Sequence, residues 1–170
     1  MNRRKAIRNI AVISSGIVLL PACEMEKLPV YENLALESQQ RELIGWLTNA
    51  ILPKEGLEIS TPESTSDFIL TMLNDCYAPE DIRQYLAGSK IFMQYVKDEY
   101  GVSYNNLNPE QSILLFSELM KSDLLPESLK YFLATTKQLT VRHFTTSEYF
   151  MKNHLDFEFA PGRYLGCVPV

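Results

Sequence analysis

The chain carries its longest helical pattern, PEDIRQYLAGSKIFMQYVKDEYG, between residues 79 and 101. Pro79 followed by two acidic residues is typical of a first helical turn, because proline lacks the N–H that this turn leaves unpaired and acids favour the positive end of the helix dipole. Gly101 is a typical stop, and Gly88 is a candidate break in the middle. The apolar positions recur at the spacing of one helix face: Ile82, Tyr85, Leu86, Phe92, Tyr95 and Val96.

Similar patterns lie on both sides of this stretch. We expect helices that open at Thr61-Pro62, at Asn108-Pro109 and at Pro126-Glu127, and one within residues 34–53, with Trp46 at the edge of its apolar face. Their expected core positions are Leu36, Leu43, Ile44, Leu47, Ile51, Phe68, Ile69, Met72, Leu73, Ile113, Leu114, Phe116, Leu119, Met120, Leu129, Phe132, Leu133, Leu139 and Val141. No convincing strand alternation occurs, so the sequence predicts an all-α domain of five or six helices with an extended C-terminal arm.

The composition suits one globular domain. With 46% hydrophobic and 22% charged residues over 170 positions, the chain can bury a core. We predict a signal peptide over residues 1–22, a tether over 23–33, and a single helical domain with its C-terminal arm over 34–170.

The first 22 residues have the pattern of an export signal. Basic residues precede an apolar stretch, Ile10 to Leu20, which is too short for a bilayer core of ~30 Å. The following Leu20-Pro21-Ala22-Cys23 resembles a bacterial lipobox, so we predict that Cys23 is the lipidated first residue of the mature chain. An unmodified cysteine after a plain secretory signal is the alternative. Lipidation would anchor the chain to a membrane on the periplasmic side of the cell envelope.

The basic residues of this signal, Arg3, Arg4, Lys5 and Arg8, have two further implications. The Arg3-Arg4 pair fits the twin-arginine route, which exports folded proteins, and fits an ordinary basic region equally well. Removing the four leaves 12 basic against 21 acidic residues, so the formal net charge changes from −5 to −9. Such an acidic chain argues against nucleic acid as a partner.

Two cysteines, Cys76 and Cys167, remain if Cys23 is acylated. In an oxidising compartment they can pair with each other, or Cys167 can bridge to another chain. Cys76 follows an apolar helical stripe and also fits a buried thiol. The sequence leaves these three outcomes open.

Motifs of catalysis and of cofactor binding are missing from the sequence. His143 and His154 are the only histidines, and no HExxH, CxxC, GxGxxG, Walker loop or GxSxG occurs. Pairs of neighbouring acids, such as Glu80-Asp81, lie at helix ends, where solvated charge is the usual role. We therefore expect a non-catalytic chain without a metal or cofactor of its own.

The C-terminal segment from Thr135 onwards is unusually rich in aromatic residues. A small helical domain has difficulty burying so many aromatic side chains in its core. The last ten residues, PGRYLGCVPV, contain two prolines and two glycines and have no neighbouring strand to pair with, although they include apolar side chains. The aromatic residues are Phe144, Tyr149, Phe150, Phe157, Phe159 and Tyr164.

Several short motifs occur in an order that resembles one known family. They are the Arg3-Arg4 pair, the helix end Ala50-Ile51-Leu52-Pro53, Thr61-Pro62 before Phe68-Ile69, NPEQSILL within residues 107–115, FTTSE at 144–148 and PGRYLGC at 161–167. Over roughly Leu43 to Val168 the chain resembles subunit 3, the small subunit, of membrane-bound sugar dehydrogenases of the gluconate 2-dehydrogenase type.

The resemblance implies a non-catalytic partner of a large flavin-dependent dehydrogenase of the glucose-methanol-choline type. FAD would lie in that large subunit, which oxidises a sugar or sugar acid. The small subunit would escort it through the twin-arginine route, because a flavoprotein must fold around its cofactor before export. A further cytochrome c subunit is left open, as are the substrate and the membrane that holds the lipid.

We predict that the partner-binding residues lie in FTTSE and in the C-terminal arm. An arm without internal hydrogen-bond partners can satisfy its backbone on another protein, with Tyr164 as an aromatic anchor. The predicted set is Phe144, Thr145, Tyr149, Pro161, Gly162, Tyr164, Gly166 and Cys167. Two rival functions are an independent periplasmic lipoprotein that binds a ligand or another envelope protein, and an enzyme in its own right.

Overall fold

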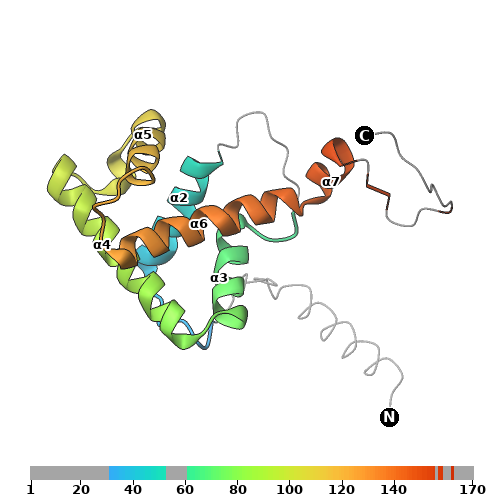
Figure 1. Cartoon of the computed structure of the whole chain (residues 1–170), viewed down its shortest axis with the longest axis horizontal. Coiled ribbons are helices and arrows are strands. Elements are labelled where there is room, and N and C mark those ends of the chain that lie inside the picture. Colours follow the sequence, from blue (N-terminus) through green and yellow to red (C-terminus); the bar gives the residue numbers. More distant parts are fainter. Residues whose placement is uncertain (1–30, 53–60, 156, 159–161, 163–170) are drawn as a thin grey trace, which may run out of the picture. The chain divides into compact units, whose positions relative to one another are not determined.

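The computed structural model describes residues 31–52, 61–155, 157–158 and 162, and these residues form α-helices without any strand (Figure 1). This confirms the predicted all-α class. The elements are α2 (Ser38–Ile51), α3 (Thr65–Cys76), α4 (Pro79–Tyr100), the 3₁₀ turn η1 (Tyr104–Asn106), α5 (Pro109–Leu119), α6 (Glu127–Thr145) and α7 (Glu148–His154).

Helices α4 and α6 form the most extensive helix pair and cross at Gly88. A Cβ atom on Gly88 would lie 2.0 Å from the Ser128 carbonyl oxygen and 2.6 Å from the Phe132 Cβ atom. The glycine therefore allows the two backbones to approach closely. The expected break at Gly88 is wrong: α4 is one continuous helix, because contact with α6 offsets the cost of about 1 kcal/mol that glycine carries in a helix.

The core lies where α2, α3, α4 and α6 meet, and α5 and η1 contribute further buried residues to it. Tyr85 and Phe132 pack edge to face at 4.9 Å between ring centroids, and both are fully buried. The buried hydroxyl of Tyr85 is 2.9 Å from Thr136 Oγ1, and Gln40 Nε2 donates to Ser89 Oγ at 2.7 Å. Among the described residues, every buried side-chain nitrogen or oxygen has a hydrogen-bond partner. Apolar packing and satisfied polar groups thus both fix the arrangement of these helices.

Helix starts follow the sequence signals with one correction. Asn108 caps α5 by accepting a bond from the Gln111 N–H, and Pro79 occupies the first turn of α4, as predicted. At α3 the predicted start at Thr61-Pro62 is wrong. Ser64 is the cap there, since its Oγ accepts a bond from the Asp67 N–H at 3.1 Å.

The predicted core face of α5 is also partly wrong. Leu115, Phe116 and Leu119 are buried, whereas Ile113 is 43% and Leu114 is 60% exposed. Four apolar residues in a row, residues 113–116, fit two overlapping helix faces, so the local pattern could not choose between these faces. Met120 and Val141, two other expected core residues, are exposed as well.

Candidate functional site

The FTTSE motif is a helix stop followed at once by a helix start. Thr146 Oγ1 donates to the Arg142 carbonyl oxygen at 2.8 Å at the end of α6. Ser147 then caps α7: its Oγ donates to the Phe144 carbonyl oxygen at 2.6 Å and accepts from the Phe150 N–H at 3.2 Å. Hydroxyl side chains therefore satisfy backbone groups on both sides of the junction, which sets where α7 leaves α6.

Helix α7 has no buried residue and packs mainly on the end of α6. Phe150 is its central ring. It meets Phe144 edge to face at 5.1 Å and lies 5.0 Å from the His154 ring, measured between centroids. Tyr149 lies 6.1 Å from the same histidine. These rings, with the exposed Leu155 and Phe157, form what we call the aromatic end of the chain: Phe144, Tyr149, Phe150, His154, Leu155 and Phe157.

The predicted partner-binding residues fall into two groups. Phe144, Thr145 and Tyr149 are half-buried and lie together at the α6–α7 junction, and Gly162 is exposed. Pro161, Tyr164, Gly166 and Cys167 lie outside the described residues, as do Arg3, Arg4 and Cys23. The sequence did not predict α7 as a separate helix, although Ser147-Glu148 is a typical start signal. It also did not single out Leu155, which is 59% exposed.

Cys76 is exposed at the end of α3. Of the three outcomes that the sequence left open, the buried thiol is therefore wrong. The alternatives that involve Cys167 stay predictions, because Cys167 lies outside the described residues.

His143 is buried at the C-terminal end of α6, beside the junction. Its ring stacks on Phe68 at 4.7 Å between centroids, and its Nδ1 lies 3.1 Å from Thr65 Oγ1. Burial lowers the pKa of His143, and the nearby Glu63 acts weakly in the opposite direction. Through its stacking on Phe68 and its hydrogen bond to Thr65, the His143 imidazole forms a structural contact between α6 and α3.

Two open pockets lie on the helical body away from this junction. A pocket of about 510 Å³ has a mostly polar lining that includes Glu42, Lys90 and Lys97. An apolar pocket of about 260 Å³ lies between Trp46, Leu107 and Ile113. Within the residues that the structure describes, no three His, Cys, Asp or Glu side chains are grouped so that they could hold a metal ion.

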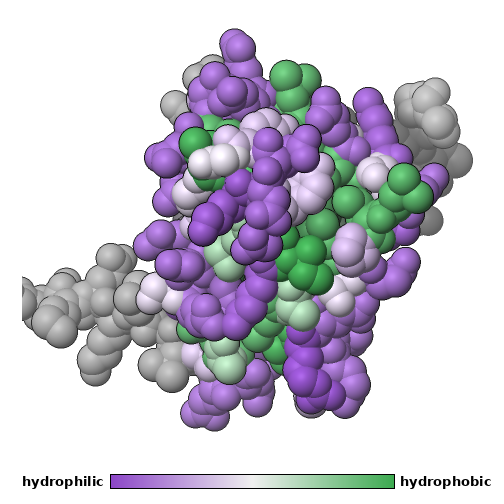
Figure 2. Space-filling model, turned by 90° about the vertical axis from the view of Figure 1, so that its left-hand side faces the viewer, coloured by the Kyte–Doolittle hydropathy of each residue, from purple (hydrophilic) through white to green (hydrophobic). Residues whose placement is uncertain are grey.

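Hydrophobic side chains also gather on the side of the molecule that carries α5 and the end of α4 (Figure 2). The exposed apolar residues here include Ile113 and Leu114 of α5 and Val102, which follows α4. None of the described helices is both long and apolar enough to be a membrane span.

A family model described as gluconate 2-dehydrogenase subunit 3 matches residues 38–162. The chain belongs to this family. The resemblance inferred from the short motifs is thereby confirmed. No curated protein and no solved structure matches the chain.

The match to the gluconate 2-dehydrogenase subunit 3 family extends from the first residue of α2 to Gly162, so it includes the α6–α7 junction and the aromatic end. The family is that of an accessory subunit of a dehydrogenase complex.

Proposed function

We propose that this chain is a non-catalytic small subunit that binds a large catalytic subunit of a sugar or sugar-acid dehydrogenase. In this proposal the large subunit is a flavoprotein of the glucose-methanol-choline type that holds FAD, and the small subunit holds no cofactor. The proposal extends the family assignment, which names a subunit of a dehydrogenase.

The observation that carries the proposal is the exposure of the aromatic end. All residues of α7 are at least partly accessible, and Leu155 and Phe157 are 59% and 43% exposed. Large apolar side chains that cluster on a surface mark protein interaction sites more often than scattered ones do. Aromatic side chains also contribute more than most others to protein–protein affinity. The aromatic end is thus where we place the dehydrogenase.

The proposal also includes export and anchoring: the small subunit escorts the dehydrogenase across the membrane and then anchors it there. Arg3-Arg4 and the lipobox before Cys23 supply one export signal and one lipid for the complex. A signal on one chain can export two proteins only if they associate first, and a flavoprotein binds FAD on folding. The small subunit would therefore bind its partner before export and hold it at the membrane on the periplasmic side afterwards.

The test is recovery of the partner from the native cell. The full chain with a C-terminal affinity tag should co-purify from membranes with a larger protein that has a flavin absorbance spectrum. Removal of residues 161–170, with the tag kept, should reduce this recovery. Isolation of the untruncated chain as a monomer without any flavoprotein would overturn the proposal and favour the independent lipoprotein.

A further inference from the structure

Helix α6 differs in charge from the rest of this acidic chain. Between Glu127 and Glu148 the sequence carries Lys130, Lys137 and Arg142 and no Asp or Glu, although acidic residues outnumber basic ones by 21 to 16 overall. Such a helix is a local region of positive charge on a negative protein.

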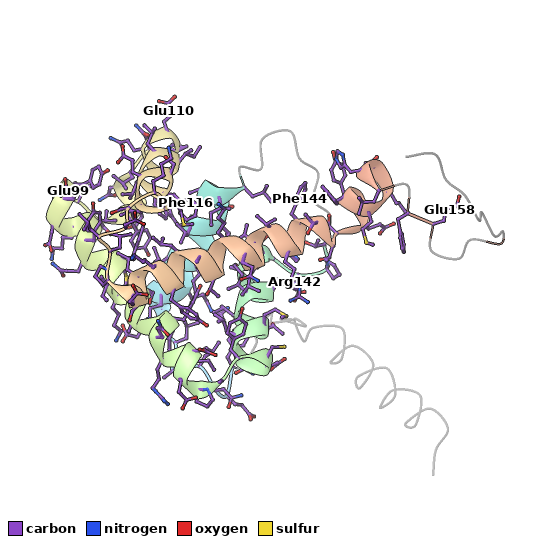
Figure 3. All side chains as sticks on the ribbon, viewed as in Figure 1. Glu99, Glu110, Phe116, Arg142, Phe144 and Glu158 are labelled. Carbon is purple, nitrogen blue, oxygen red and sulfur yellow. The ribbon has the colours of Figure 1, made fainter. Side chains whose placement is uncertain are left out.

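The solvent side of α6 has uncharged side chains along its middle and cations at its edges. Its middle line consists of the exposed Ala134, the 44% exposed Val141 and the half-buried Thr145, which recur on one face of the helix. Lys137 and Arg142 lie on the two sides of this line, because five positions along an α-helix with 3.6 residues per turn correspond to a rotation of about 140° around the helix axis. Figure 3 shows Arg142 and Phe144 on opposite sides of the C-terminal part of α6. We call this surface the basic face of α6: Ala134, Lys137, Gln138, Val141, Arg142 and Thr145.

The cations of the basic face have no carboxylate partner within the described residues. The ion pairs there use Arg41, Arg83, Lys90, Lys130 and Lys152, and Lys130 pairs only with Glu127 on its own helix. Arg142 and Asp81 both interact electrostatically with Tyr77, but they do not form an ion pair with each other. Asp81 of α4 lies beside Tyr131, and Glu63, before α3, interacts with His143. Lys137 and Arg142 are therefore available for charges of another molecule.

We infer that the basic face of α6 binds an acidic surface of the dehydrogenase subunit, next to the aromatic end that anchors it. This inference rests on the proposed function. Thr145 of the basic face directly follows Phe144 of the aromatic end at the C-terminal end of α6, which is about 28 Å long at 1.5 Å per residue, so the two surfaces adjoin there. Small side chains in the middle allow a partner backbone to come close, and the flanking cations meet its carboxylates.

This arrangement also gives the contact its specificity. The chain as a whole carries more acidic than basic residues, so its net charge repels an acidic partner while the basic face attracts it. Charge pairs at the rim of an interface act mainly on the association rate and make it depend on salt, because a Debye length of about 8 Å at physiological ionic strength screens exposed charges.

The experiment compares two charge-reversed forms of the full-length, tagged chain in its native cell. Lys137→Glu combined with Arg142→Glu reverses the basic face. Lys97→Glu combined with Lys121→Glu changes the net charge equally at two exposed lysines, one on α4 and one after α5, which also lack a carboxylate partner among the described residues. The probe is the flavoprotein that co-purifies with the unmodified chain, quantified by its flavin absorbance at 50 and at 300 mM salt.

We expect the Lys137→Glu/Arg142→Glu form to recover about ten-fold less flavoprotein at low salt and to lose the salt dependence of recovery, while the Lys97→Glu/Lys121→Glu form stays within about two-fold of the unmodified chain. Circular dichroism checks that both forms are folded. Equal recovery by both forms at both salt concentrations would overturn the inference and leave the proposed function intact. Absence of flavoprotein from the unmodified chain would overturn both.

A third outcome would assign the basic face to lipid. Both forms, without their signal peptide and lipid, are mixed with phosphatidylglycerol vesicles. If only the Lys137→Glu/Arg142→Glu form loses vesicle binding and it still recovers flavoprotein at the unmodified level, the face binds an anionic membrane and the inference is wrong.

Discussion

Phe68 and His143 stack with their ring centroids 4.7 Å apart and their planes at 26°, and this pair holds the last turns of α6 against α3. Phe144, the first ring of the aromatic end, follows His143 directly in the sequence. The position of the proposed binding surface relative to the helical core therefore depends on this contact.

The stack should make stability depend on pH. Burial lowers the pKa of His143 in the folded chain, so below about pH 6.5 the unfolded chain binds the proton more readily and the free energy of unfolding falls. Denaturant unfolding at several pH values should show a steeper loss on acidification for the unmodified chain than for His143→Phe. The exposed His154 provides the control: His154→Gln should keep the unmodified slope. Identical slopes for all three chains would contradict the prediction.

Gly88→Ala should destabilise the fold although alanine is the better helix former. Its Cβ would meet the Ser128 carbonyl oxygen at 2.0 Å, and separating α4 from α6 costs about 1–3 kcal/mol or more. The matched control is Gly45→Ala in α2, where nothing lies within 4 Å of the new Cβ, and a gain of about 0.5–1 kcal/mol is expected. Thermal unfolding measures both. A gain for Gly88→Ala would show that the helices do not approach as described.

The orientation of α5 can be tested with two adjacent leucines. Leu115 is 2% exposed and Leu114 is 60% exposed. Leu115→Ala should lower the free energy of unfolding by about 2–5 kcal/mol, whereas Leu114→Ala should change it by no more than about 0.5 kcal/mol. Urea denaturation followed by Trp46 fluorescence gives both values. The reverse order would mean that α5 presents the other face to the core.

Ser147→Ala should loosen α7 without unfolding the domain. The serine hydroxyl bonds both the Phe144 carbonyl oxygen and the Phe150 N–H, and loss of such a cap costs about 1 kcal/mol. Amide hydrogen exchange should become faster in residues 148–154 and stay unchanged in α4. Ser117→Ala, which removes a hydroxyl bound to the Leu114 carbonyl oxygen in α5, is the control. Unchanged exchange in α7 would show that the cap does not hold this helix.

Single aromatic side chains of the aromatic end should each contribute measurably to partner binding. Tyr149→Ala should reduce flavoprotein recovery by about ten-fold or more, because aromatic residues often dominate interface energies. Tyr100→Ala, at the far end of α4, should leave recovery unchanged although that tyrosine is 37% exposed. Both substitutions are on accessible side chains, so stability should change little. An equal loss of flavoprotein recovery for the two variants, or no loss for either, would mean that the partner binds elsewhere.

The sequence predicted the helices well where their signals are local. Pro79, Asn108-Pro109 and Pro126-Glu127 mark the starts of α4, α5 and α6, because capping bonds and proline geometry act within one turn. The start of α3 was predicted wrongly at Thr61-Pro62 for the same reason, since this pair is also a local capping signal. A better cap, Ser64, follows three residues later, and the local pattern did not rank the two.

What the sequence by itself determined is the all-α class, most of the apolar stripes and the family, since these depend on periodicity and on the order of short motifs. Only the tertiary structure decided that α4 continues through Gly88, that Leu115 rather than Leu114 enters the core, and that His143 is buried against Phe68. Each of these depends on atoms of another helix far along the chain, and a local pattern contains no information about that neighbour.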